Sequence, residues 1–171
     1  MKPKLLVLEL WGIGDLIIAS PFLRAACETH EVHLLAQAYA EELRPHFWPE
    51  VQVIPFRMPW TVHRGKYRLH TWPWIRLTRL IRRLRRERFD LAVSARWDPR
   101  DDVLMWLSGT RERTGFPRLG SARLESLSLE KPDPLSHRYE RWRVLGHALG
   151  IRVPALSDAV KPRLRPVGHV T

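Results

Sequence analysis

Residues 4–26 read KLLVLELWGIGDLIIASPFLRAA, and this stretch decides the fold. Lys4–Leu10 is almost entirely apolar, as expected of a strand buried on both faces of a parallel sheet. A turn with the pattern Gly-x-Gly-Asp follows at residues 12–15, and the apolar residues after it predict a helix. Because ligands of open α/β sheets bind at the carboxyl ends of the strands, the turn places Asp15 where a ligand would lie.

The turn differs from the dinucleotide-binding fingerprint. That pattern, G-x-G-x-x-G, requires a third glycine at position 17, which is Ile17. A carboxylate in the turn would also repel a pyrophosphate placed at the N-terminus of the helix. We therefore expect that this strand, turn and helix do not form a phosphate-binding loop and have another function.

Strand-like and helix-like segments alternate along the rest of the chain. The first helix should bend or restart at Ser20-Pro21, an N-cap followed by proline, and run to about Glu28. Further strands are predicted at residues 32–36, 51–56, 89–95 and 113–116, and further helices at 39–43, 75–88, 101–107 and 137–149. This alternation predicts the α/β class: a Rossmann-like, doubly wound parallel sheet flanked by helices. The proline-punctuated residues 156–171 are predicted to form a linker after a domain of residues 1–155.

Composition narrows the classes of protein and partner. The 171 residues are 44% hydrophobic, which suits one domain with a substantial core. The single cysteine, Cys27, excludes an internal disulfide and suits a reducing compartment. No apolar run approaches the roughly 18 residues of a membrane span, and the N-terminus lacks the pattern of a signal peptide, so we expect a cytoplasmic protein. The net charge of +11 predicts an acidic partner: nucleic acid, an anionic membrane face or a phosphorylated substrate.

Three blocks of sequence resemble the N-terminal half of glycosyltransferase family 9, the ADP-heptose:lipopolysaccharide heptosyltransferases. The first is LWGIGDLIIASP at residues 10–21, similar to the family's opening motif. The second is RFDLAV at residues 88–93, continued by Arg100 and by SGTRERTGF at residues 108–116. The third is His137, Glu140 and Arg141, followed by Gly150. The polar patch that the family carries after the second strand motif is replaced here by SARW at residues 94–97.

The resemblance implies a fold, a reaction and substrates. Family members are two-domain GT-B enzymes, and their nucleotide-sugar donor, such as ADP-heptose, binds mainly in a C-terminal domain that this chain lacks. Residues 1–155 would then bind the acceptor, and the chain alone is expected to be inactive. The reaction implied is transfer of heptose or a related sugar to an anionic lipopolysaccharide-type acceptor at the inner face of the membrane. No cofactor is implied, and the eight histidines show no metal-ligand spacing.

Asp15 has two possible roles. As a general base it would take the proton of the acceptor hydroxyl, an effect typically worth 10²–10⁴ in rate. As a helix cap it would contribute roughly 1 kcal/mol to stability. The base role requires a carboxylate that an incoming alcohol can reach, so an ion pair that closes it off would count against this role.

Acceptor contacts are predicted around the same turn and on nearby arginines, because a guanidinium offers a bidentate fork to phosphates and carboxylates. The predicted acceptor-binding residues are Trp11, Gly12, Ile13, Gly14, Arg64, Lys66, Arg68, Arg96 and Arg100.

An arginine-rich helix at residues 75–88 follows an irregular aromatic segment at residues 57–74. Leu77, Leu80, Ile81 and Leu84 share one helical face, and arginines cover the remainder. The helix could be a solvated outer face, a peripheral contact with anionic lipid supported by Trp60, Tyr67, Trp72 and Trp74, or a phosphate-binding face for nucleic acid. A non-catalytic basic module that binds anionic lipid or nucleic acid is therefore the alternative function, with nucleic acid the less favoured partner.

Overall fold

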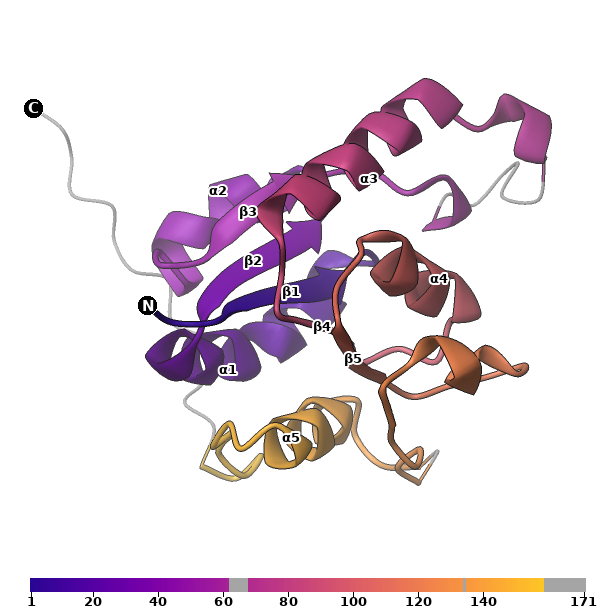
Figure 1. The fold of residues 1–171 in the computed structure, drawn as a ribbon. Coiled ribbons are helices and arrows are strands. Elements are labelled where there is room, and N and C mark those ends of the chain that lie inside the picture. Colours follow the sequence, from indigo (N-terminus) through magenta and orange to yellow (C-terminus); the bar gives the residue numbers. More distant parts are fainter. Residues whose placement is uncertain (62–67, 134, 159–171) are drawn as a thin grey trace, which may run out of the picture.

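The computed structural model describes residues 1–61, 68–133 and 135–158, and it confirms a doubly wound α/β fold. Six parallel strands form one sheet in the order β3-β2-β1-β4-β5-β6, and β1 to β5 are labelled in Figure 1. They are β1 (Lys4–Glu9), β2 (Glu31–Ala36), β3 (Gln52–Pro55), β4 (Leu91–Ser94), β5 (Glu112–Gly115) and β6 (Leu127–Ser128). The helices are α1 (Ile13–Thr29), α2 (Tyr39–Phe47), α3 (Trp74–Glu87), α4 (Pro99–Leu107) and α5 (Tyr139–Ala148), with short 3₁₀ turns at Pro59–Thr61, Leu69–Thr71 and Ser121–Leu124.

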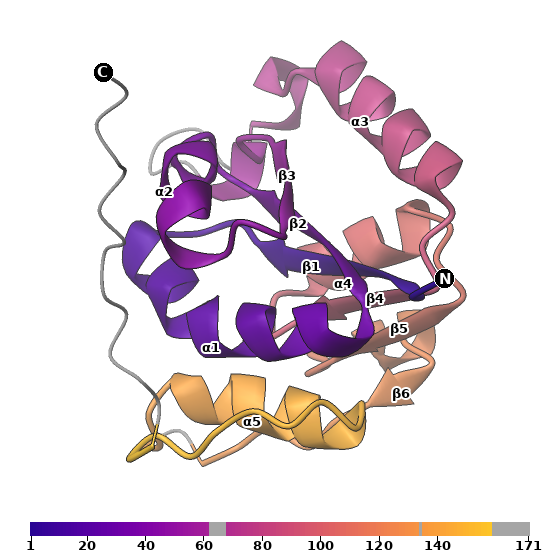
Figure 2. The ribbon, with the colours of Figure 1, turned by 90° about the vertical axis from the view of Figure 1, so that its left-hand side faces the viewer.

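Two hydrophobic layers enclose the central strand. Leu5 and Val7 of β1 pack into a cluster with residues of α1, α2 and α5, whereas Leu6 and Leu8 pack into a second cluster with residues of α3 and α4. All four side chains are completely buried, because successive residues of a strand point to opposite faces and both faces are covered. Figure 2 shows α5 lying beside α1 on one side of the sheet, with α3 on the other.

The strand order creates one crossover point, between β1 and β4. Leu5 of β1 pairs with Val32 of β2 on one side and with Leu91 of β4 on the other, and the chain winds outward from β1 in both directions. Loops that leave β1 and β4 at their carboxyl ends therefore diverge, which opens a crevice there. The turn after β1 and the segment after β4 both face this crevice.

Prolines do not mark a boundary of helix α1 or of helix α2. The restart predicted at Ser20-Pro21 is wrong: α1 runs without interruption from Ile13 to Thr29 and contains Pro21. Ser20 is buried, and its hydroxyl accepts a 2.9 Å hydrogen bond from Trp48 Nε1. The helix α2 likewise includes Pro45 and ends at Phe47. In both cases burial of the apolar residues after the proline, Phe22 in α1 and Phe47 in α2, outweighs the lost hydrogen bond.

The predicted boundaries lie within a few residues of those observed for the other elements. The predicted linker begins with Leu156–Asp158, which are exposed, and its remaining residues, 159–171, lie outside the described residues. Among the helices of the described residues, none has the length and apolarity needed to cross a membrane.

Candidate functional site

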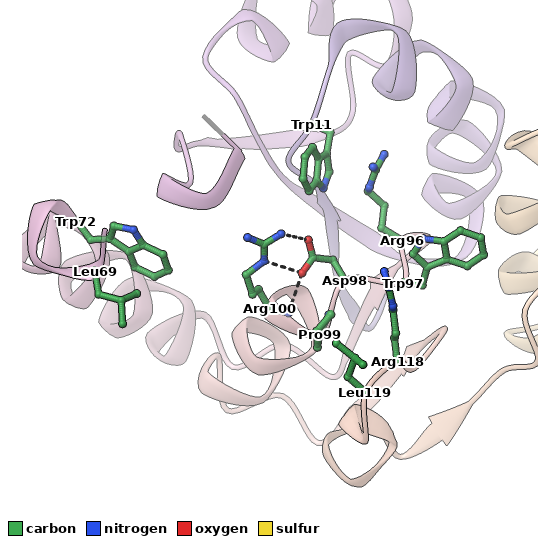
Figure 3. Close-up of a pocket in the computed structure, with 10 residues that line it drawn as sticks. All are labelled: Trp11, Leu69, Trp72, Arg96, Trp97, Asp98, Pro99, Arg100, Arg118 and Leu119. Atoms are coloured by element: carbon green, nitrogen blue, oxygen red, sulfur yellow. Dashed lines mark hydrogen bonds and ion pairs between the residues drawn. The ribbon is translucent and has the colours of Figure 1, made fainter. Parts of the chain in front are cut away.

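A cleft of about 690 Å³ opens at the crossover point (Figure 3). Two of its walls come from the segments that follow β1 and β4. The opposite walls come from the turn before α3 and from the loop after β5. The described residues that line it are Trp11, Leu69, Trp72, Arg96, Trp97, Asp98, Pro99, Arg100, Arg118 and Leu119. Three guanidinium groups among three indole rings make this a concave, partly apolar site with a positive lining.

Arg96 and Trp11 form the inner wall of the cleft. The Arg96 guanidinium carbon lies 4.3 Å from the centre of the Trp11 ring, a cation–π contact that holds both side chains in place. The carbonyl oxygen of Trp11 accepts hydrogen bonds from Gln37 Nε2 at 2.7 Å and from the Tyr39 hydroxyl at 2.6 Å. The turn after β1 is therefore fixed by a side chain from the loop after β2 and by one from α2, although its glycines could adopt many conformations.

Arg100 is held at the start of α4 by Asp98. Asp98 caps this helix by accepting a 3.1 Å hydrogen bond from the Arg100 backbone N–H, and Pro99 occupies the first helical position. The Arg100 guanidinium returns to the same carboxylate, with Nε at 2.8 Å and Nη2 at 2.6 Å (Figure 3). Burial acts to raise the pKa of Asp98, but these hydrogen bonds outweigh it and hold the pKa below its ordinary value. The arginine is thus presented to the cleft in a fixed orientation.

Asp15 lies beside the cleft, at the first turn of α1, and both of its oxygens are occupied. Its Oδ2 accepts a 3.2 Å hydrogen bond from Arg96 Nη1, and its Oδ1 accepts a 2.5 Å hydrogen bond from Arg138 Nη1. The capping role is wrong, because α1 begins after Gly12 with no side-chain cap. The side chain of Asp15 is 15% exposed and that of Arg138 is 59% exposed, so the pair with Arg138 faces solvent on the arginine side.

Carboxyl groups with raised pKa values lie beneath the cleft. Burial, reinforced by the Asp15 carboxylate, raises the pKa of Glu9 to about 8. Burial also raises the pKa of Asp101 to about 7, with Asp98 as the largest like-charge contribution. Asp101 Oδ2 accepts a 3.1 Å hydrogen bond from the Ser94 hydroxyl. At neutral pH Glu9 is therefore mostly protonated, and Asp101 is protonated in part.

The structure brings together only some of the predicted acceptor residues. Trp11, Arg96 and Arg100 line the cleft. Gly12, Ile13 and Gly14 are exposed at the start of α1 but do not line it, and Arg68 is exposed outside it. The predicted contacts Arg64 and Lys66 lie outside the described residues.

Several site residues were not predicted. Arg118 and Leu119 come from a loop whose sequence carries mixed signals. Arg138 is separated from Asp15 by 123 positions in the sequence, and no local sequence pattern predicts that the two side chains pair. Trp97 was noted in the sequence only as a departure from the family pattern. In the structure it is stacked between Lys131, with Nζ 3.3 Å from the ring centre, and Arg141, at 4.2 Å.

No metal site is apparent in the part of the chain that the structure describes, since it contains no group of three or more potential ligands among His, Cys, Asp and Glu.

Comparison with known proteins gives fold matches but no sequence matches. No protein-family model matches the chain, and no curated protein does. Among solved structures, a family 9 glycosyl transferase from Veillonella parvula matches with a TM-score of 0.68 and 15% identity over 88% of this chain. The Escherichia coli heptosyltransferase WaaC with ADP-2-deoxy-2-fluoro heptose matches at 0.65 and 16% over the same share, and E. coli heptosyltransferase II at 0.53 and 19% over 96%.

The match covers only part of each of these proteins. This chain spans 42% of the V. parvula chain, 50% of WaaC and 47% of heptosyltransferase II. Identities of 15–19% establish similarity of fold rather than of substrate. The chain thus has the Rossmann-like α/β fold found in family 9 glycosyltransferases.

Proposed function

We propose that this chain is the acceptor-binding part of a glycosyltransferase that moves heptose or a related sugar from a nucleotide-sugar donor to an anionic, lipopolysaccharide-type acceptor. The observation that carries the proposal is the cleft at the crossover point, where Arg96, Arg100 and Arg118 face a space directly beside Asp15. Fold similarity to heptosyltransferases supports the reaction class.

The positive lining of the cleft suits an acceptor that carries phosphate or carboxylate groups, because guanidinium groups bind such anions through charge-assisted, paired hydrogen bonds. The indole rings of Trp11, Trp72 and Trp97 supply flat apolar walls between the arginines. A saccharide acceptor with acidic substituents presents both kinds of surface. A nucleotide-sugar such as ADP-heptose would be bound mainly by a further domain, and no cofactor is required.

Asp15 is the proposed general base. Transfer of a sugar to a hydroxyl requires loss of the hydroxyl proton as the glycosidic bond forms, and a single base suffices for an inverting transfer because the nucleotide phosphate leaves readily. The arginines that contact Asp15 affect this role. Because Arg96 and Arg138 each donate a hydrogen bond to one Asp15 oxygen, an acceptor hydroxyl at Asp15 competes with these guanidinium groups for the carboxylate.

Acceptor binding is tested directly on the 171-residue chain. We expect a phosphorylated inner-core lipopolysaccharide saccharide to bind in isothermal titration calorimetry, and Arg118→Gln to weaken this binding about tenfold, the equivalent of ~1.4 kcal/mol. Arg123→Gln is the matched control, since Arg123 is exposed in the same loop but outside the cleft. Equal affinities for the two variants, or no binding by the unmodified chain, would contradict the proposal.

The base role is tested in a protein that joins this chain to a nucleotide-sugar-binding domain. Asp15→Asn is expected to lower turnover 10²–10⁴-fold without weakening acceptor binding. Near-normal turnover would remove Asp15 from the chemistry. The 171-residue chain by itself is expected to show no transfer.

A second candidate function is binding to an anionic membrane surface, and helix α3 favours it. Its outward arginines include Arg76, Arg79, Arg82 and Arg86, and no salt bridge among the described residues reaches any of the four. At the start of the helix, Trp74 is 50% and Ile75 is 71% exposed. A basic helix with exposed apolar residues at one end suits anionic lipid, and peripheral attachment to the inner face of the membrane would bring a lipid-linked acceptor to the adjacent cleft.

Vesicle sedimentation tests this second function. The chain should bind phosphatidylglycerol vesicles but not phosphatidylcholine vesicles, with loss of binding at high salt. The triple variant Arg79→Gln, Arg82→Gln and Arg86→Gln should bind much less than a control that changes Arg111, Arg123 and Arg152 in the same way. Preference for duplex DNA over lipid at equal salt would assign the helix to nucleic acid instead.

A further inference from the structure

Arg138 connects α5 to α1, two helices that are far apart in sequence. It immediately precedes α5, and its guanidinium reaches Asp15 in the first turn of α1. Arg96, which follows β4, holds the other oxygen of the same carboxylate. Three segments of the chain thus converge on one acidic side chain.

Positive charge exceeds negative charge around the Asp15 carboxylate. A third guanidinium, that of Arg141, lines the same small cavity as Arg96, Arg138 and Asp15. Burial, together with repulsion from Arg96 and Arg138, lowers the pKa of Arg141. Glu9 lines the cavity as well, but as a largely neutral acid at pH 7 because its pKa is raised to about 8. Three guanidinium groups thus line the cavity beside Asp15, two of them hydrogen-bonded to its carboxylate and the third, that of Arg141, 4.2 Å from the centre of the Trp97 ring.

The dipole of α5 makes the position of these two arginines less favourable still. Cations are favoured at the C-terminal end of a helix and disfavoured at its N-terminal end, where the helix dipole is positive. Arg138 and Arg141 lie before and within the first turn of α5. An external anion would relieve both the repulsion among the arginines and their unfavourable placement on the helix.

The space beside Asp15 is narrow while Arg138 stays in place. The cavity measures only about 10 Å³, roughly the smallest space that can hold one water molecule. Arg138 is the most exposed member of the cluster, with 59% of its side chain accessible, whereas Arg96 is 24% accessible and stacked on Trp11. Arg138 is therefore the side chain that can swing outward at least cost.

We propose that a phosphate group binds to Arg138, Arg141 and Arg96 in front of Asp15, and that its arrival draws Arg138 away and uncovers Asp15 Oδ1. The inference deepens the proposed transferase function: the carboxylate would become available only when a phosphorylated substrate is in place. It also revises the expectation that Asp15 repels phosphate from this turn, since two guanidinium groups already neutralise it.

Asp15 and the ligand compete for Arg138, and this competition gives the inference a distinctive signature. Inorganic pyrophosphate titrated into the 171-residue chain by calorimetry at fixed ionic strength is the probe. Arg138→Gln and Arg141→Gln should each weaken binding about tenfold, because each removes a charge-assisted hydrogen bond. Asp15→Asn should instead tighten binding severalfold, because it removes the internal competitor.

Arg152→Gln is the matched control, since Arg152 is exposed beyond the C-terminal end of α5 and should leave the affinity within twofold. Circular dichroism and the urea midpoint establish that each variant is folded. A folded Arg138→Gln variant with unchanged affinity, or a folded Asp15→Asn variant that binds no more tightly than the unmodified chain, would overturn the inference.

Two further titrations identify the source of the phosphate. Competition of pyrophosphate by ADP would assign the site to the donor, and competition by a sugar phosphate such as glucose 1-phosphate would assign it to the acceptor. Displacement by neither would contradict a role in transfer. The Arg118→Gln experiment on the cleft is independent of this site, so a failure of the proposed acceptor binding can be told apart from a failure of this inference.

Discussion

At the scale of single residues, one buried hydroxyl joins two helices. Ser20 lies within α1, and its hydroxyl accepts the hydrogen bond of Trp48, which follows the end of α2 and is 1% exposed. A buried indole N–H without a partner carries the full cost of its desolvation. The residue that the sequence presents as a helix cap therefore serves as an acceptor in the core.

Ser20→Ala is expected to lower the free energy of unfolding by ~1–3 kcal/mol, because it leaves Trp48 Nε1 unsatisfied. Urea unfolding followed by far-ultraviolet circular dichroism measures the change. Ser157→Ala, at an exposed position, is the control and should stay within ~0.5 kcal/mol of the unmodified chain. A stability loss no larger than that of the control would argue against the structural role of this hydrogen bond.

The site residues that could be predicted are those attached to a local pattern. Asp15 follows from the turn after an apolar strand, and Arg96 and Arg100 follow the strand that neighbours it in the sheet. Arg138 could not be found in this way, because its importance arises only when α5 packs against α1. Long-range ion pairs depend on how helices cover a sheet, and a single sequence carries little information about that arrangement.

At the scale of elements, α5 is locked to the segment that follows it. Gly146 lies in α5, and a Cβ atom added there would be 2.3 Å from Val153 Cγ2 and 2.9 Å from the carbonyl oxygen of Ile151. The helix and the irregular segment after it therefore approach more closely than a side chain at position 146 would allow. This contact fixes α5, and with it the position of Arg138 and Arg141.

Gly146→Ala should lower the free energy of unfolding by ~1–3 kcal/mol, as expected of overpacking, despite the higher helix propensity of alanine. Gly14→Ala provides a matched comparison in α1, where the added Cβ meets nothing within 4 Å. That variant should gain up to ~1 kcal/mol, because only propensity changes. Denaturant midpoints that move in the same direction for both variants would contradict the packing described here.

Helix and strand types could be predicted from periodicity, whereas several boundaries could not. The pattern of Leu77, Leu80 and Leu84 correctly placed the buried face of α3. The prolines at positions 21 and 45 suggested breaks that tertiary packing overrides. The two-residue strand β6 has no signal of its own, since Leu127 and Ser128 are exposed and are defined only by pairing with β5.

At the scale of the whole molecule, neutral acids are buried in a strongly basic protein. The pKa of Glu9 is raised to about 8, and those of Asp101 and Glu125 to about 7, in each case chiefly by burial. A carboxyl whose pKa is higher in the folded state holds its proton there after the unfolded chain has released it. The folded state therefore loses relative stability as pH rises from the ordinary carboxyl range toward pH 8.

Stability should thus be higher at pH 5 than at pH 8, in a urea titration at constant ionic strength. Glu9→Gln mimics the protonated side chain and should reduce this difference by an amount on the order of a few kcal/mol, since one pKa unit corresponds to ~1.4 kcal/mol. Glu130→Gln, at an exposed site, should leave the pH dependence unchanged. Stability that rises between pH 5 and pH 8 would be inconsistent with neutral buried acids.

The central place of β1 in the sheet has a consequence for synthesis. β1 is synthesised shortly before its neighbour β2, but its other edge has no partner until β4 follows, whose Leu91 pairs with Leu5. Until then the nascent chain presents an unpaired strand edge with four consecutive apolar residues, Leu5 to Leu8, the kind of surface that chaperones recognise and that aggregates when unprotected. Slowing translation between the codons for α3 and β4 should lengthen this vulnerable interval, whereas the same pause placed after β4 should be harmless.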